Sequence, residues 1–464
     1  MNFKVEIKNI GKLADSELRI GRFTVFAGPN NTGKSFVSKL LYSLYHAMRE
    51  DYAENHICNL TQSLSKTLNY LIQTIRDENL PLHSFVEEIK VLEQRIEALE
   101  NGVRSGRGDI EELDKIIPEL SDRVENIQKR FPDMRSSLKQ EISHFSYSLV
   151  ETLETLEESL DELQKSIHDK NAEAFVAFIT KGIIKRNLIQ NFQVENLSEL
   201  MSKEGEPANV EVEGLGKFQF STGETSFDME FADKNPELRY LLYSRVIYLE
   251  SPAYWKLKNA LENLRLDPKH LSNRREQLSG IPGYFYDLAS IIKIKFSEDI
   301  AFPDLYKRLT SKNVLGGKIV ISETGDLSFQ ENGRNFSLPV TAMGIANLGI
   351  LALLIDRKIL DKGAFLFIDE PEAHLHPAWQ VIMAETLFDL SRQGVKVVIA
   401  THSADILKWL EVHVKKNPDD EQLVALNQFP PNGHEVDEDF ETRIAKIKQE
   451  LTKPFSDLYL EGLL

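Results

Sequence analysis

The chain of 464 residues contains a single cysteine, Cys58. One cysteine excludes a disulfide within the chain and any zinc or iron–sulfur site built from several cysteines. A protein of the reducing cytosol fits this composition. The sequence therefore points away from small disulfide-stabilised and cysteine-rich metal-binding classes.

Long hydrophobic runs are also missing. No uncharged apolar stretch reaches the roughly 20 residues that span a bilayer, and the nearest lies around residues 348–355. Residues 1–10 alternate like a half-solvated strand and lack the basic and apolar regions of a signal peptide. We therefore expect a soluble, cytoplasmic protein with no membrane partner.

An excess of basic residues is absent as well. The chain has 55 Lys and Arg against 72 Asp and Glu, a net charge of -17. Such a balance argues against a surface that adheres generally to nucleic acid or anionic lipid, although a local basic groove stays compatible with it. With 42% hydrophobic and 27% charged residues, the chain has a globular composition and the length of two or three domains.

A phosphate-binding loop occupies residues 28–35, with the sequence GPNNTGKS. It follows a short apolar run at 22–27 and precedes a helical pattern at 36–48, which is the strand, loop and helix context of such loops. Its glycines let backbone N–H groups converge on phosphate oxygens, and the helix dipole adds to the attraction. Lys34 would neutralise the terminal phosphates and Ser35 would offer an oxygen to Mg²⁺. The expected contacts of this ATP or GTP site are Gly28, Asn30, Asn31, Thr32, Gly33, Lys34, Ser35 and Phe36.

An acidic pair follows an apolar run much later in the chain. Residues 364–368 are apolar and lead directly into Asp369 and Glu370. Ligands bind at the carboxyl ends of strands in open parallel α/β sheets. Asp369 is expected to hold Mg²⁺ through its water shell, and Glu370 to orient, or accept a proton from, the water that attacks the γ-phosphate.

Two further positions are candidates for the same site. A second apolar strand pattern, 395–401, ends at His402, which is placed to hydrogen-bond a γ-phosphate. Gly344 lies before an apolar helix and could present backbone N–H groups to an anion bound by a second copy of the protein. An ordinary helix entry explains Gly344 equally well.

The segment 51–205 has the composition of an inserted all-α module between head segments 1–50 and 206–464. Apolar residues recur at alternating steps of three and four in it. They are Ile89, Leu92, Ile96, Leu99 and Val103, then Ile142 and Phe145, and then Leu153, Leu156, Leu160, Leu163 and Ile167. Because Gly106, Gly108, Pro118 and Pro132 intervene, the segment is expected to fold back or kink. We predict a helical hairpin or short antiparallel coiled coil, with ordinary bundle core as the alternative.

Strand patterns return after residue 206. Alternation at 210–213, 217–220 and 226–231 predicts an antiparallel meander, and 245–249 a buried strand. A helical stretch interrupted at Pro282 and Gly283, a hairpin at 318–329 and a final charged amphipathic helix complete the expected elements. The predicted class is α/β.

The loop, the acidic strand and His402 together resemble the ATPase heads of the ABC class, and most closely the branch that contains RecF, Rad50 and the overcoming-lysogenization-defect proteins. The string at 372–377, EAHLHP, is the most specific part of this resemblance, which covers residues 1–48 and 210–410. It implies an ABC-type head with a mixed sheet, flanking helices and an antiparallel β-subdomain. It also implies Mg²⁺ and ATP held between two heads of a homodimer or larger homo-oligomer, with Lys34, Ser35, Asp369, Glu370 and His402 in their family roles.

The chain departs from the family pattern at two places. Gly344 would fall in the signature that the opposite head contributes, but Met343 stands where the family has a serine. No glutamine follows the strand at 245–249, where Glu250 stands instead, and Gln193 is a weaker candidate for that role.

Stand-alone heads with a helical insertion resemble the ATPase subunits of bacterial anti-phage systems such as PARIS, with its Toprim protein, and Septu, with its HNH nuclease. About 55 residues follow Leu410, fewer than a typical domain has, and the acidic group at 419–421 reads as a solvated loop. We therefore expect a separate effector nuclease and a foreign trigger such as a phage protein. The alternative is a DNA-repair or chromosome-maintenance ATPase that clamps DNA; the energising subunit of a membrane transporter is disfavoured by the helical insertion.

Overall fold

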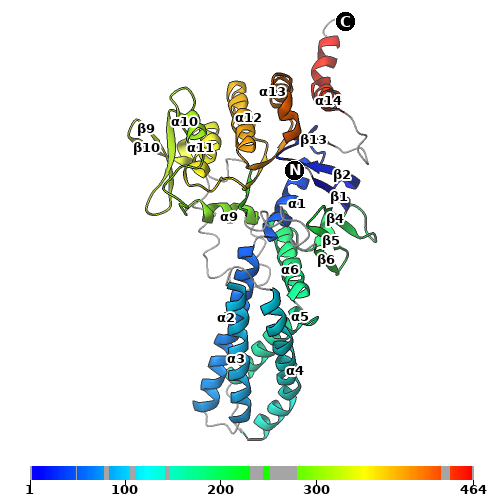
Figure 1. The fold of residues 1–464 in the computed structure, drawn as a ribbon, viewed down its shortest axis with the longest axis vertical. Coiled ribbons are helices and arrows are strands. Elements are labelled where there is room, and N and C mark those ends of the chain that lie inside the picture. Colours follow the sequence, from blue (N-terminus) through cyan, green and yellow to red (C-terminus); the bar gives the residue numbers. More distant parts are fainter. Residues whose placement is uncertain are drawn as a thin grey trace. The chain divides into compact units, whose positions relative to one another are not determined.

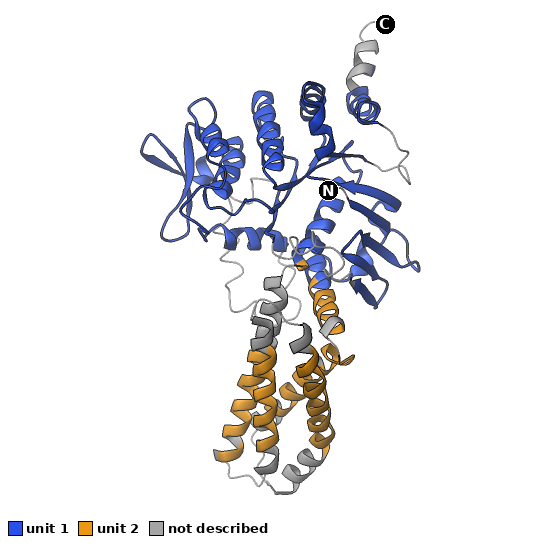
Figure 2. Ribbon diagram, viewed as in Figure 1, with its two compact units in different colours: residues 1–46, 184–464 blue, residues 47–183 orange. Residues whose placement is uncertain are grey.

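The computed structural model describes residues 3–48, 50–77, 83–104, 110–141, 147–170, 172–229, 244–250, 280–429 and 439–461 (Figure 1). The chain divides into two compact units (Figure 2). The head unit combines residues 1–46 with 184–464, and the helical unit is 47–183. The sequence prediction placed these boundaries at 50 and 205. The helical stretch predicted after residue 252 lies mostly outside the described residues.

A parallel five-stranded sheet forms the centre of the head unit. Its order is β13 (Val424–Gln428), β3 (Phe23–Ala27), β12 (Lys396–Thr401), β11 (Phe365–Asp369) and β7 (Val246–Leu249), with every neighbouring pair parallel. The strands β3, β11 and β7 are buried along their whole length, as expected of a parallel sheet covered on both faces. Because parallel strands end at the same edge, the loop after β3 and the acids after β11 meet there.

Helices cover both faces of this sheet. Alternate side chains of a strand point to opposite faces, and in β11 Phe365 and Phe367 meet tyrosines of α1 (Lys34–Ala47), with Tyr45 stacked on Phe365 at 4.8 Å. Leu366 and Ile368 face the other way, into a core shared with α11 (Met343–Asp356), α12 (Pro377–Arg392) and α13 (Ala404–Lys416). The continuous apolar run of β11 is therefore buried on both faces of the sheet.

Two antiparallel sheets complete the head unit. The first has the order β2 (Leu13–Ile20), β1 (Phe3–Ile10), β4 (Ala208–Val212), β5 (Gly216–Phe220) and β6 (Thr225–Met229), so the predicted meander is confirmed and joined by the first two strands. The second is β8 (Gly317–Ile321), β9 (Leu327–Glu331) and β10 (Arg334–Ser337). The short helix η5 (Leu338–Val340) packs on β9, whereas α9 (Gly283–Ile291) packs on β7 and α10 (Pro303–Thr310) packs on α11.

Four helices of the helical unit pack in a closed ring. They are α2 (Glu50–Asp77), α3 (His83–Arg104), α4 (Ile110–Glu141) and α5 (Tyr147–Ser166), and each contacts two of the others. The stripe residues Ile89 to Leu99 and Leu153 to Ile167 are buried, while the side chains of Val103, Ile142 and Phe145 lie outside the described set. This packing corresponds to the bundle-core alternative. A further helix, α6 (Ala172–Phe192), runs from the helical unit into the head unit.

The insertion folds back into several packed helices, as predicted, but its two prolines do not mark helix ends. Pro118 and Pro132 both lie inside α4. A proline removes one helical hydrogen bond, but here the flanking side chains Ile117, Leu120 and Phe131 are fully buried in the bundle. Packing of the apolar face thus maintains the helix. Among the described residues, no helix is both long and apolar enough to cross a bilayer.

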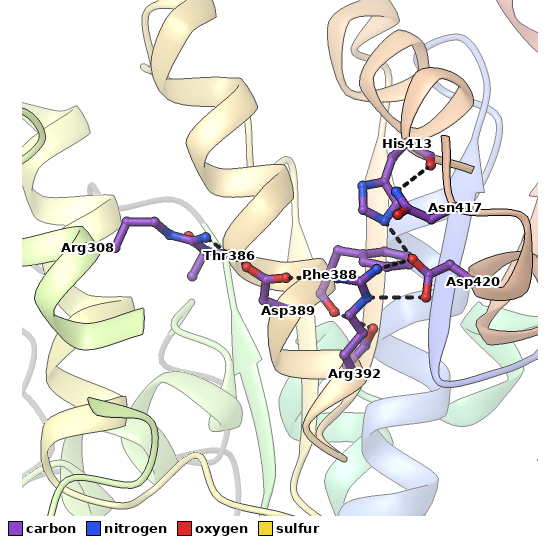
Figure 3. Close-up of polar contacts among 9 residues, drawn as sticks. Arg308, Thr386, Phe388, Asp389, Arg392, His413, Asn417 and Asp420 are labelled. Atoms are coloured by element: carbon purple, nitrogen blue, oxygen red, sulfur yellow. Dashed lines mark hydrogen bonds and ion pairs between the residues drawn. The ribbon is translucent and has the colours of Figure 1, made fainter. Parts of the chain in front are cut away.

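An ion-pair network joins helices on one side of the head unit (Figure 3). Asp420, in η6 (Pro418–Leu423), accepts hydrogen bonds from Arg392 of α12 and pairs with His413 Nε2 of α13 at 2.9 Å. Asp389 bridges Arg392 and Arg308, whose Nη1 lies 2.8 Å from its carboxylate. The interpretation of residues 419–421 as a solvated loop was therefore wrong for Asp420, because its partners come from helices that the sequence pattern does not place beside it. The terminal α14 (Phe440–Glu461) packs on α13.

Candidate functional site

The phosphate-binding loop connects β3 to α1 and has two residues in left-handed conformations. Asn31 has φ 64° and Gly33 φ 101°, which suits asparagine and glycine. A Cβ on Gly28 would lie 2.0 Å from the carbonyl oxygen of Phe429, so no larger residue fits at that position. Lys12, from the turn between β1 and β2, donates to the Asn31 carbonyl at 2.6 Å.

The other predicted loop residues differ in exposure. Asn30 is exposed and Thr32 is half-buried, with the Thr32 hydroxyl donating to the Pro29 carbonyl at 2.8 Å. The Phe36 ring packs on Phe192 at 4.6 Å between centroids, so a contribution of Phe36 to phosphate binding would come from its backbone N–H.

Lys34 is the first residue of α1 and only 6% of it is exposed. Its ammonium donates to the Pro29 carbonyl at 2.6 Å. Burial lowers the pKa of Lys34, while the negative charges of Asp369, Glu370 and Glu372 act in the opposite direction. The lysine from the N-terminal segment and the acids from the far end of the sequence are therefore electrostatic neighbours.

Ser35 and Asp369 are in direct contact. The Ser35 hydroxyl donates to Asp369 Oδ1 at 2.9 Å, across 334 positions of sequence. Burial raises the pKa of Asp369 to about 6, against the opposing effect of the Ser35 hydrogen bond and with a further increase from nearby Glu250. A carboxylate held in this way is destabilised by desolvation and gains from a nearby cation.

The donor set of this contact fits Mg²⁺. A hydroxyl and a carboxylate are the hard oxygen ligands that the ion prefers, and Mg²⁺ is usually bound by one or two carboxylates together with substrate phosphates. Within the described residues, no group of three or more His, Cys, Asp or Glu side chains could hold a metal without such help. Ser35 and Asp369 would thus hold the ion jointly with a nucleotide.

Glu370 follows β11 in a strained conformation. Its φ is 49°, which costs a non-glycine residue roughly 1–2 kcal/mol, and its N–H donates to the Ala400 carbonyl of β12 at 2.8 Å. The half-exposed carboxylate lies 3.6 Å from His402 Nδ1. The structure thus brings Glu370 and His402 together at the edge where β11 and β12 end.

A third carboxylate, Glu372, escaped the sequence analysis as a site residue. It is 6% exposed, and its Oε1 accepts hydrogen bonds from the Thr401 hydroxyl at 2.7 Å and the His402 N–H at 2.9 Å. The only available signal was its place in the EAHLHP string, since both partners lie about 30 positions later in the chain.

Lys39 also escaped the sequence analysis, together with Tyr284. Lys39 lies one helical turn after Ser35 on α1, so the two share a face, and its ammonium pairs with Glu250 at 2.8 Å. The Tyr284 hydroxyl donates to the other Glu250 oxygen. Glu250 is thus held beside Asp369, whereas Gln193 bonds to Gly280 N and Gln190 O instead.

Gly344 occupies the start of α11 and packs against the turn that follows Glu370. A Cβ there would lie 2.9 Å from the His374 carbonyl oxygen, and Asn347 of the same helix donates weakly to the Pro371 and Ala373 carbonyls at 3.4 Å. The atoms nearest to Gly344 therefore belong to residues 374–379 and not to the phosphate loop. Met343 is half-buried beside it.

Comparison with known proteins agrees with this geometry. The family model described as AAA ATPase domain matches residues 1–407. The chain belongs to this family. The match includes the phosphate loop, the helical unit, the acids after β11 and His402. In this AAA ATPase domain the helical unit interrupts the head unit in sequence, and the parallel sheet of the head unit bears the candidate site.

A curated relative matches over a short stretch. The Old nuclease of Escherichia phage P2 is 46% identical over 46 residues, which is 10% of this chain and 8% of the nuclease. The chain thus spans under a tenth of that relative's length.

Among solved structures, this chain is similar to an Smc head bound to the C-winged helix domain of ScpA. The similarity covers 88% of this chain and 90% of that chain, at 10% identity and a TM-score of 0.37. An Smc head with coiled coil and joint from Pyrococcus yayanosii matches at 13% identity, 97% and 99% coverage and a TM-score of 0.31. With TM-scores this low, the fold assignment rests on the strand pairing itself.

Proposed function

We propose that this AAA ATPase domain binds ATP with Mg²⁺ and hydrolyses it. The contact between Ser35 and Asp369 carries this proposal, because it unites the two halves of a phosphate and metal site. Lys34 would neutralise the β- and γ-phosphates, and the loop N–H groups would bind their oxygens. The ion, held by Ser35 and Asp369, would stabilise the charge that develops on the transferred phosphate.

Glu370 and His402 would act on the γ-phosphate side of the site. Glu370, half-exposed at the sheet edge, would orient the attacking water and accept its proton. His402, 3.6 Å from Glu370, would hydrogen-bond a γ-phosphate oxygen. The strained backbone of Glu370 supports this assignment, since such strain is retained where surrounding structure and function require it.

Two copies would associate around the nucleotide through the start of α11. The N-cap residue Ala342 makes no side-chain cap, so the first N–H groups of this helix stay available to an anion. Since the atoms nearest to Gly344 come from residues 374–379 and not from the phosphate loop of the same chain, the phosphate that it meets would belong to a second head. ATP-dependent dimerisation, measured by light scattering with and without nucleotide, tests this step.

The cellular role that we favour is a sensor or scaffold ATPase of an anti-phage defence system, which controls a separate effector nuclease. The net charge of -17 and the short similarity to the Old nuclease support this role over DNA clamping. Copurification with a nuclease encoded beside it would support the proposal. Binding of duplex DNA with a steep salt dependence, together with stimulated hydrolysis, would favour the repair alternative.

Nucleotide binding is the first test of the proposed chemistry. Lys34→Ala should lose ATP binding in calorimetry, because the phosphates would keep no positive side chain inside the loop. Lys408→Ala, which removes an exposed lysine that pairs with Glu411, is the matched control and should bind as the wild type does. Affinity of Lys34→Ala near that of the control would reject the loop assignment.

A further inference from the structure

Glu372 is a buried carboxylate with an incomplete set of partners. Its Oε1 accepts two hydrogen bonds, from Thr401 and from the His402 backbone. Its Oε2 is buried and has no hydrogen-bond partner among the described residues. A buried charged oxygen without partners destabilises a fold, so stability alone does not account for a carboxylate here.

The backbone around Glu372 is held in an unfavourable conformation. Glu370 and His374 both have positive φ, 49° and 60°. The turn between them is closed by hydrogen bonds from Ala373 N to Glu370 O at 2.9 Å and from Leu375 N to Glu372 O at 3.1 Å. Two left-handed residues in one short turn hold the Glu372 carboxylate against the C-terminal end of β12.

This carboxylate lies where it can orient His402. Glu372 Oε1 binds the His402 backbone N–H and is 3.5 Å from the ring nitrogen Nδ1. The Glu370 carboxylate lies 3.6 Å from the same nitrogen. With both carboxylates on the Nδ1 side, Nε2 is the nitrogen that remains to face a phosphate. A buried acceptor that sets ring orientation in this way is the usual support of a working histidine.

We propose that Glu372 is a positioning residue for hydrolysis, which fixes His402 and the end of β12 relative to Glu370. Glu372 itself touches neither the nucleotide nor the attacking water, and acts through His402. The inference deepens the proposed ATPase function and rests on it.

Two substitutions separate the contributions of Glu372. Glu372→Ala removes both accepted hydrogen bonds, and kcat should fall on the order of 100-fold, because small displacements of catalytic groups have effects of this size. Glu372→Gln keeps the size of the side chain and an oxygen acceptor for Thr401 and His402. Its kcat should therefore fall less, on the order of 10-fold. In both variants the KM for ATP and the calorimetric affinity should change less than about threefold, because the phosphate loop is untouched.

A double-mutant cycle with His402→Ala distinguishes positioning from general structural support. If Glu372 acts through His402, adding Glu372→Ala to His402→Ala should change kcat by less than about twofold. Glu421→Ala, an exposed glutamate of η6 outside the site, is the matched control and should leave kcat unchanged. Thermal melting identifies folded variants, and if Glu372→Ala does not fold, the Gln variant takes its place in the cycle.

Three results would overturn the inference while leaving the ATPase function intact. They are wild-type kcat in both Glu372 variants, losses that multiply with that of His402→Ala, and a raised KM with kcat unchanged. A wild-type protein that binds ATP but never turns it over would instead overturn the proposed function, and this inference with it.

Discussion

Two groups of carboxylates in the head unit differ in how their charge is balanced. The site carboxylates are Asp369, Glu370 and Glu372, and the network carboxylates are Asp389 and Asp420. Burial raises the pKa of Asp369 to about 6, and Glu372 has an oxygen without a partner among the described residues. For Asp420, burial raises the pKa, but the hydrogen bonds from Arg392 and His413 outweigh it and hold the pKa below its ordinary value.

The difference is between carboxylates whose charge the fold leaves uncompensated and carboxylates whose charge the fold compensates. The network carboxylates have arginine partners on neighbouring helices (Figure 3), so their charges are compensated within the fold. The site carboxylates lie at the same edge of the sheet as Lys34, a buried lysine whose ammonium bonds to its own loop. Charge that the fold leaves uncompensated is available to a cation and a reacting water. Substitutions in the two groups should therefore have opposite consequences for stability and activity.

The largest expected effect is on catalysis at Glu370. Glu370→Gln should bind ATP with Mg²⁺ but lower kcat by on the order of 100-fold or more, because the amide cannot accept a proton from the attacking water. Steady-state hydrolysis measures kcat, and light scattering should show closed assemblies that accumulate with ATP. Unchanged turnover would remove Glu370 from the catalytic role.

Asp369→Asn should give activity and stability effects of opposite sign. The folded-state pKa of Asp369 is raised above its unfolded value, so its protonated form is favoured by the fold, and its charge destabilises the protein as pH rises through about 6. At pH 7.5 without nucleotide, the neutral variant should be more stable by about 1–3 kcal/mol in urea unfolding. ATP hydrolysis should also fall, because the proposed metal ligand is gone. A less stable Asp369→Asn would contradict this account of the burial.

Asp420→Asn is the matched substitution in the network and should show the reverse pattern. Its folded-state pKa is depressed, so the carboxylate stabilises the fold above its unfolded pKa, and this contribution is lost as pH falls through the folded value. The amide NH₂ cannot accept the hydrogen bonds that Arg392 Nη2 and His413 make with Asp420 Oδ2, and their loss should cost about 1–3 kcal/mol at pH 7.5, with kcat unchanged in the folded protein. A loss of activity without a loss of stability would place Asp420 in the functional group.

The smallest effect is expected at Met343, next to Gly344 at the start of α11. Met343→Ser would supply a hydroxyl beside N–H groups that could meet a phosphate of a second head, so hydrolysis should rise or stay unchanged. The rate should be measured at several protein concentrations, because the contact lies between copies. A severe loss would mean that methionine packing governs this helix start.

Local patterns predicted the parts of the site that local chemistry defines. The loop at 28–35 and the acids at 369 and 370 each follow an apolar strand run, and those runs became β3 and β11. His402 was predicted for the same reason, as the residue after β12. The sequence did not predict the Glu372 contacts with Thr401 and His402, or the Lys39 pair with Glu250, because these depend on which strands and helices become neighbours.

The same limit explains why two prolines lie inside α4 and why the prediction for Asp420 was wrong. Proline statistics describe an isolated helix, whereas α4 is held by the apolar faces of α3 and α5, which no local rule includes. Asp420 looked like a loop residue because Arg392 lies 28 positions away. In both cases long-range packing decided the outcome.

A crystal structure of Glu370→Gln with ATP and Mg²⁺ tests the central claim most directly. We expect the terminal phosphates to contact Lys34, the ion to contact the Ser35 hydroxyl with Asp369 in its immediate shell, and residue 370 to face a water beside the γ-phosphate. Nucleotide bound elsewhere, or an ion remote from both Ser35 and Asp369, would contradict it.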